Sequence, residues 1–202
     1  MKKRYKLLLL VFISFILTLI IYFIYKSDKR TYIALGSNFN QDFNLTFNYI
    51  DYIAYYKKDF IISNYTNNKE LIETTLLKIG KNENKIKYSL KNAEIITLGI
   101  SNYELNNYKE ITNEIAVEYL NNIYKLLKEL KSLNDNTWII NNLDSKYSFF
   151  INKIKQFSNN LNLKYVDTQV IEEKNRIYYE NTDYINYHGH NKIAKYIIKD
   201  IK

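Results

Sequence analysis

Few residues of this 202-residue chain are of the types that carry out covalent or metal chemistry. The chain has no cysteine, four glycines and only two histidines, His188 and His190. Thiolate nucleophiles, disulfides and thiolate zinc sites are therefore excluded, and we expect no metal site and no cofactor. A serine hydroxyl is a nucleophile only when a base lies within hydrogen-bond reach. The candidate chemistry is therefore that of a serine with one of these two imidazoles, or ligand binding without catalysis.

The elements that must position such residues alternate between strands and helices. The apolar pattern predicts strands at 31–35, 59–63, 94–98, 137–140 and 163–166. It predicts helices at 45–57, 69–79, 85–90, 112–133, 144–160 (capped by Asp144) and 189–201. Strands that are apolar on both faces belong to a parallel sheet covered by helices on both sides. We therefore predict a flavodoxin-like, three-layer α/β/α fold whose five-stranded parallel sheet has the order 2-1-3-4-5.

A sheet of this order forms its site beyond the carboxyl ends of the strands, where the order reverses between strands 1 and 3. The segments expected there are 36–40, 99–104 and 181–190. They contain the polar candidates Ser37, Asn38, Ser101, Asn102, Asp183 and His188.

The same segments resemble sequence blocks of the SGNH/GDSL hydrolases. Residues 32–38 (YIALGSN), 95–102 (IITLGISN) and 181–194 (NTDYINYHGHNKIA) are similar to the first, third and fifth blocks. The usual family patterns are A-L-G-D-S, I-T-I-G-x-N-D and D-x-x-H-P-N-x-x-G-H-x-x-I-A. The resemblance covers nearly all of 31–201 and implies the same flavodoxin-like fold. It also implies a serine ester hydrolase of the esterase, lipase or deacetylase type, with a Ser–His–Asp arrangement.

The catalytic positions depart from the family pattern. Aligned without a gap, the family aspartate falls on Ser37 and its nucleophilic serine on Asn38, whose amide cannot accept an acyl group. With one residue deleted, Ser37 becomes the nucleophile, and both registers stay open. In the fifth block, the position of the catalytic histidine holds Tyr184 and that of the aspartate holds Asn181.

If the chain is active, the resemblance implies a shifted catalytic set. Ser37 would attack, His188 would accept the proton and Asp183 would orient the imidazole. The expected oxyanion or ligand contacts are Asn38, Asn64 (near the position of the second-block glycine), Ser101, Asn102 and the Ser37 backbone N–H. Each of these residues also has an ordinary structural interpretation. Ser37 would be a turn or capping serine, Ser101 and Asn102 would form loop hydrogen bonds, and Asp183 would be a loop or capping carboxylate. His188 would be an exposed loop histidine and His190 a structural one.

Residues 7–25 are 19 uncharged, mostly apolar residues that follow four cations. A helix of this length spans about 28 Å, close to the hydrocarbon thickness of a bilayer. We expect an uncleaved transmembrane signal-anchor whose N-terminus is cytoplasmic. Residues 1–30 would then comprise a basic cytoplasmic tip, the anchor and a short linker, and residues 31–202 would form one extracytoplasmic domain. A cleaved signal peptide and a buried core helix are the alternatives.

The net charge of +8 does not indicate a nucleic-acid partner. Seven cations and one anion in residues 1–30 account for +6, which leaves +2 for residues 31–202. A nearly balanced domain has no evident surface for phosphate backbones.

Three functions are compatible with this sequence. The first is a membrane-tethered, catalytically impaired SGNH/GDSL-like protein that binds an envelope ligand or a partner protein. The second is an active, divergent serine ester hydrolase acting on acylated envelope glycans, lipids or small esters. The third is an unrelated flavodoxin-like interaction module.

Overall fold

The computed structural model describes residues 11–22, 30–39, 47–81, 85–171 and 185–199. The chain divides into two compact units, Met1–Arg30 and Thr31–Lys202. In the first unit, residues 11–22 are helical and exposed. Among the described residues, no helix is both long enough and apolar enough to cross a bilayer. The predicted anchor at 7–25 extends past the described helix at both ends.

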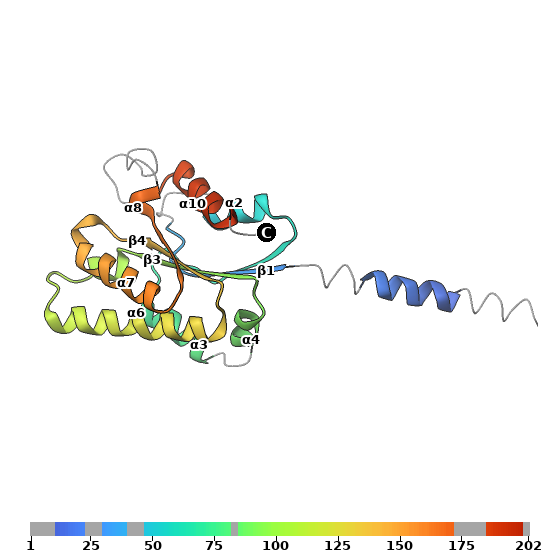
Figure 1. Ribbon diagram of the computed structural model, residues 1–202, viewed down its shortest axis with the longest axis horizontal. Coiled ribbons are helices and arrows are strands. Elements are labelled where there is room, and N and C mark those ends of the chain that lie inside the picture. The colour runs from blue at the N-terminus through green and yellow to red at the C-terminus, as the bar shows by residue number, and fades with distance from the viewer. Residues whose placement is uncertain (1–10, 23–29, 40–46, 82–84, 172–184, 200–202) are drawn as a thin grey trace, which may run out of the picture. The chain divides into compact units, whose positions relative to one another are not determined.

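Five strands of the second unit form one sheet in the order β2-β1-β3-β4-β5 (Figure 1). The strands are β1 (Arg30–Gly36), β2 (Phe60–Asn64), β3 (Ile95–Ser101), β4 (Thr137–Asn142) and β5 (Lys164–Asp167). β3 pairs in parallel with β1 and with β4, and β4 pairs in parallel with β5. The predicted strand order is confirmed. β3 and β4 extend two or three residues past their predicted ends, since Ile100 and Asn141 are still buried in the sheet.

Helices cover both faces of the sheet (Figure 1). One face carries α2 (Tyr49–Tyr56) and α10 (Tyr187–Lys199), and the other carries α3 (Ile72–Lys81), α4 (Lys85–Lys91), α6 (Asn113–Leu133) and α7 (Ser148–Asn160). Two short helices that the sequence pattern did not predict, α5 (Tyr103–Asn106) and α8 (Thr168–Ile171), follow β3 and β5.

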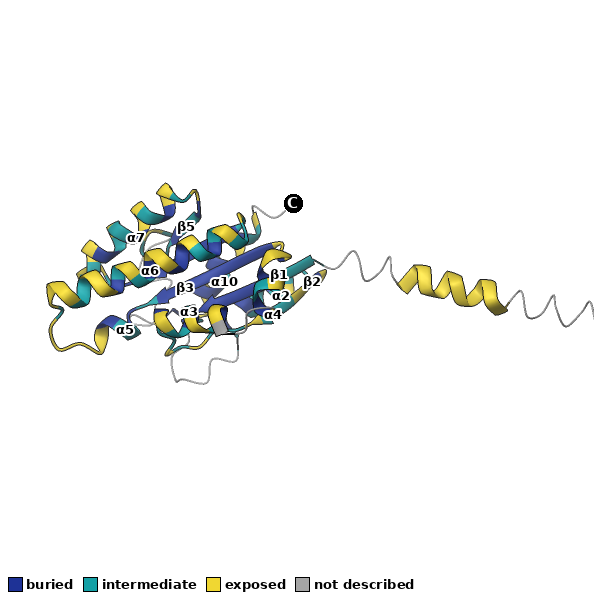
Figure 2. Ribbon diagram, turned by 90° about the horizontal axis from the view of Figure 1, so that it is seen from below, coloured by how far each residue is buried: buried dark blue, intermediate teal, exposed yellow. Residues whose placement is uncertain are grey.

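The side chains of β1 show how the sheet divides the core. Ile33 and Leu35 belong to the buried cluster beneath α3, α4, α6 and α7. Tyr32 and Ala34 belong to the cluster beneath α2 and α10. Successive side chains of a strand point to opposite faces, so a strand buried on both faces must be apolar throughout. Figure 2 shows the buried strands between helices whose outer faces are exposed.

Capping side chains determine where several helices begin. α2 starts at Tyr49, four residues later than predicted, because Asn48 and Asp51 form a reciprocal capping box. The predicted cap Asp144 accepts the Lys146 N–H, but it begins a 3₁₀ turn (Ser145–Tyr147) that leads into α7.

α10 starts at Tyr187, two residues before the predicted start. The side chain of Asn186 accepts the Gly189 N–H at 2.9 Å, which stabilises this earlier first turn. His188 therefore lies inside the first turn of α10 and not in the preceding loop.

Candidate functional site

The ends of β1 and β3 approach each other more closely than side chains would allow. Gly36 is paired with Gly99 and has a φ of +74°. A Cβ on Gly36 would lie 2.3 Å from the Gly99 carbonyl oxygen, and one on Gly99 would lie 1.9 Å from the Ser37 carbonyl oxygen. Both positions therefore require glycine, and this contact holds Ser37 against the end of β3.

Ser37 uses its polar groups within the turn that follows β1. Its N–H donates to the Gly99 carbonyl oxygen at 2.8 Å, and its Oγ accepts the Phe39 N–H at 3.1 Å. The residue is 2% exposed. Within the described ranges, neither histidine is hydrogen-bonded to Ser37. The next residue, Asn38, is partly exposed. This is the geometry of a serine that stabilises a turn.

Asn102 lies at the end of β3 with its amide orientation fixed. Its Oδ1 accepts the Asp144 N–H at 2.7 Å, and the side chain is 7% exposed. A backbone N–H can only donate, so the oxygen of the amide must face Asp144. The amide nitrogen makes no hydrogen bond in the described part of the chain, so it can donate to a ligand. Ser101, one residue earlier, is partly exposed.

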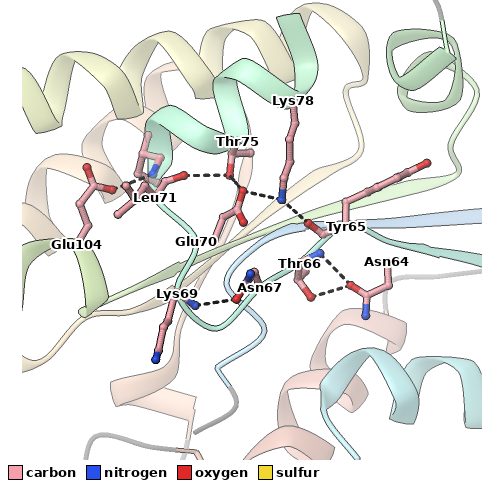
Figure 3. A network of polar contacts seen from close by, with 11 residues as sticks. Asn64, Tyr65, Thr66, Asn67, Lys69, Glu70, Leu71, Thr75, Lys78 and Glu104 are labelled. Atoms are coloured by element: carbon pink, nitrogen blue, oxygen red, sulfur yellow. Dashed lines mark hydrogen bonds and ion pairs between the residues drawn. The ribbon is translucent and has the colours of Figure 1, made fainter. Parts of the chain in front are cut away.

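Asn64 is the last residue of β2 and leads into a loop that is tied to the end of β1. It is exposed, and its Oδ1 accepts from the N–H of Thr66 at 3.0 Å and from its hydroxyl at 2.6 Å (Figure 3). The Asn67 N–H then donates to the Gly36 carbonyl oxygen at 2.9 Å. Lys78 fixes the far side of this loop, through an ion pair to Glu70 at 2.7 Å and a hydrogen bond to the Tyr65 carbonyl at 3.2 Å.

His190 is buried between α10 and α2. Its Nδ1 accepts the N–H of Tyr49, the first residue of α2, at 3.2 Å, and its ring is stacked on the Tyr49 ring with the centroids 6.3 Å apart. Burial lowers the pKa of His190 to about 3, so the ring is neutral and Nε2 carries the proton. This N–H has no partner among the described residues. His190 thus joins two helices and does not contact Ser37 through a hydrogen bond.

His188 and Asp183 complete the predicted set. His188 is exposed in the first turn of α10. Asp183 lies outside the described residues. The structure therefore brings Ser37, Ser101 and Asn102 to neighbouring strand ends, and Asn64 to the adjoining loop. The proposed roles of these residues stay predictions.

Glu104, which follows Asn102 by two residues, was not among the site residues predicted from the sequence. Its carboxylate accepts the N–H of Ile72, the first residue of α3, at 2.8 Å (Figure 3). Burial raises the pKa of Glu104, and the nearby charges of Glu73 and Glu118 raise it further. A glutamate directly after a buried strand was the available signal, but its partner on α3 is 32 residues away.

Solved structures of other proteins share the fold of this chain. No family model matches the chain, and no curated protein matches it. Its solved neighbours include Axe2, an acetylxylan esterase from Geobacillus stearothermophilus, with a TM-score of 0.63 and 14% identity, covering 84% of this chain and 93% of that one. A member of the lipolytic G-D-S-L family from Veillonella parvula has a TM-score of 0.60 and 10% identity, covering 85% and 97%.

A third neighbour is a carbohydrate esterase whose active site displays divergent catalytic and non-catalytic binding functions. Its TM-score is 0.55 at 15% identity, and the match covers 85% of this chain and 67% of that one. Identities this low establish the fold alone. Together with the strand order and the glycine contact at the switch point, they show that this chain has the SGNH/GDSL hydrolase fold.

Proposed function

We propose that this protein uses the SGNH/GDSL hydrolase fold to bind a ligand at the ends of β1 and β3, with little or no ester hydrolysis. The hydrogen bonding of Ser37 carries this proposal. Ser37 is 2% exposed, and its hydroxyl accepts the Phe39 N–H. No described histidine forms a hydrogen bond with it. A serine without a base in reach is a weak nucleophile.

The oxyanion donors support the same conclusion. The Ser37 N–H, which the sequence predicts as one such donor, donates to Gly99 instead. Removing a single oxyanion donor typically lowers kcat by about 10² to 10³. The fixed amide of Asn102 remains as a donor, and a donor without a nucleophile is suited to binding a carbonyl, carboxylate or acyl oxygen.

The ligand class rests on location and on the named neighbours. We propose that residues 7–25 anchor the chain in the cell membrane and that 31–202 is extracytoplasmic. Acylated envelope glycans, lipids, small esters or a partner protein would then be within reach. Two of the named neighbours are esterases of carbohydrate substrates, which favours an acylated glycan.

The alternative is an active, divergent serine ester hydrolase that uses Ser37, His188 and Asp183. The fold favours it, because each named neighbour is an esterase or belongs to a lipolytic family. An unrelated flavodoxin-like module is less favoured, since it would not explain why the named neighbours are esterases or a lipolytic family member.

Hydrolysis of a chromogenic acetyl ester by the detergent-solubilised full chain tests the proposal. We expect no turnover above buffer, and no difference between the parent protein and Ser37→Ala or His188→Ala. We also expect calorimetry to detect binding of an acetylated xylo-oligosaccharide without release of acetate, and Asn102→Leu to weaken that binding. Turnover that is lost in both Ser37→Ala and His188→Ala would contradict the proposal and establish the hydrolase.

A further inference from the structure

A small pocket lies on the face of the sheet opposite α2 and α10. It has a volume of about 190 Å³ and is formed by the start of α3, by α5 with the residues after it, and by the N-terminal half of α6. Its wall includes Glu73, Glu104, Glu118 and Tyr119. It is distinct from the turn of Ser37 and uses none of the residues proposed to bind the acyl ligand.

Three carboxylates give the pocket an uncompensated negative charge. Glu104 is half-buried, while Glu73 and Glu118 are exposed at the rim. None of the three forms an ion pair within the described residues, although the chain has 29 lysines and arginines. Glu70, close by in sequence, does have a lysine partner. Mutual repulsion among the three carboxylates adds to the burial that raises the pKa of Glu104.

Tyr119, one of the residues that line the pocket, carries a buried hydroxyl without a partner among the described residues. Tyr119 is 3% exposed, and its hydroxyl makes no hydrogen bond among the described residues. The hydroxyl lies near Glu104, whose charge adds to burial in raising the pKa of Tyr119. An unpaired buried hydroxyl is unfavourable, so native proteins rarely retain one without a reason. This group is an independent indication that a polar ligand completes the pocket.

The carboxylates do not converge as metal ligands do. Within the described ranges, no three His, Cys, Asp or Glu side chains could hold one metal ion. The acceptors surround a space, and the amides of Asn107 and Asn122 add to them. Hydrogen-bond acceptors spread around the pocket are better suited to an organic cation that has N–H donors at both ends than to a single metal ion.

The size of the pocket limits the ligand. Its volume is about six times the roughly 30 Å³ that one water molecule occupies in the liquid. It is also below the range of about 300–1,000 Å³ typical of pockets for drug-sized ligands. Ile115 and the Tyr119 ring provide an apolar wall for a short alkyl chain.

We propose that this pocket binds a small aliphatic diamine or polyamine. One ammonium group bonds to Glu104 and the Tyr119 hydroxyl at the base, and a second lies between Glu73 and Glu118 at the rim. The alkyl chain between them packs on Ile115. Binding neutralises three carboxylates that otherwise repel one another.

Calorimetric titration of the full chain with 1,4-diaminobutane tests this proposal. We expect saturable binding at one site per chain. Butylamine, with one ammonium group, should bind about tenfold more weakly, and 1,4-butanediol should not bind, because charge-assisted hydrogen bonds are the stronger ones. Equal binding of the diol, or no saturable heat with the diamine, would overturn the proposal.

Variants distinguish binding in the pocket from nonspecific attraction of the diamine to other surface carboxylates. The exposed rim substitutions Glu73→Gln and Glu118→Gln should each weaken binding about two- to fivefold, as expected for exposed ion pairs. Glu104→Gln and Tyr119→Phe should weaken it more, with circular dichroism confirming their fold. The matched control is Glu114→Gln. Glu114 is exposed on α6, one turn before Glu118, and does not line the pocket. Equal losses in the control, or displacement of the diamine by stoichiometric Mg²⁺, would refute the diamine site.

Discussion

At the residue scale, the two histidines illustrate how surroundings decide what an imidazole can do. They are two positions apart on α10, yet His188 is exposed and His190 is completely buried. The Nδ1 of His190 is occupied by the Tyr49 N–H. A base must be reachable by substrate and must exchange its proton, and a ring enclosed between two helices can do neither. His190 therefore acts as a structural acceptor that fixes the start of α2.

The buried ring predicts a dependence of stability on acid pH. The folded-state pKa of His190 is about 3, below the unfolded value of about 6.5, so the unfolded state binds more protons between these pH values. We expect the free energy of unfolding to fall as pH falls through this window, with a slope from His190 of up to about 1.4 kcal/mol per pH unit. Urea denaturation at a series of pH values measures it.

His190→Phe is the informative variant for this slope. It removes the titration but leaves the Tyr49 N–H without its acceptor, at a cost of about 1–3 kcal/mol near neutral pH. The matched substitution His188→Phe should retain the slope that His190 causes. An acid slope that is unchanged in His190→Phe would show that other groups are responsible.

At the element scale, the contact between the ends of β1 and β3 sets the geometry of the site. Gly36 and Gly99 allow the two strands to approach until the Ser37 N–H donates to the Gly99 carbonyl. The next residues of β3 and α5 then present Asn102 toward Asp144 and Glu104 toward the start of α3. The close approach of the β1 and β3 backbones thus positions Ser37. The short helix α5, which follows β3, contributes Glu104 to the acidic pocket.

Gly99→Ala tests the importance of this contact. The added Cβ would lie 1.9 Å from a backbone oxygen, so the strand ends must separate. We expect a loss of about 1–3 kcal/mol in the free energy of unfolding, as for other overpacked positions. Thermal or urea denaturation measures it.

Gly80→Ala provides the control for this substitution. Nothing lies within 4 Å of a Cβ at Gly80, which is on α3. Alanine is a better helix former than glycine, so this variant should be about 0.5–1 kcal/mol more stable. A Gly99→Ala protein as stable as the parent would mean that the strand ends can separate without loss.

At the scale of the whole molecule, the chain combines an N-terminal unit that contains an apolar helix with an SGNH/GDSL-fold domain. Residues 11–22 of the N-terminal unit form a helix whose side chains are all exposed. Exposed valine, phenylalanine, leucine and isoleucine side chains are unfavourable in water. This supports the proposal that residues 7–25 lie in a bilayer.

Membrane extraction tests this arrangement. The full chain should resist extraction from membranes by alkaline carbonate, and a protein lacking residues 7–25 should be extracted. Leu17→Arg places a charge near the centre of the apolar run, at a cost of about 2.5–3.5 kcal/mol for insertion, and should impair anchoring. The matched Leu17→Ile substitution should not. Complete extraction of the full chain would contradict the anchor.

Patterns in the sequence were enough to predict the strand order and the resemblance to SGNH/GDSL hydrolases, and the sheet topology and the solved neighbours confirm both. These follow from local patterns, because apolar periodicity and strand-end glycines are readable within a few neighbouring residues. Contacts between residues that lie far apart in the sequence could not be predicted in this way. Ser37 meets Gly99, Asn102 meets Asp144, and Tyr49 meets His190 across 141 residues. Such pairings depend on the register of strands and the packing of helices, so which donors remain free for a ligand emerges only when the whole chain is folded.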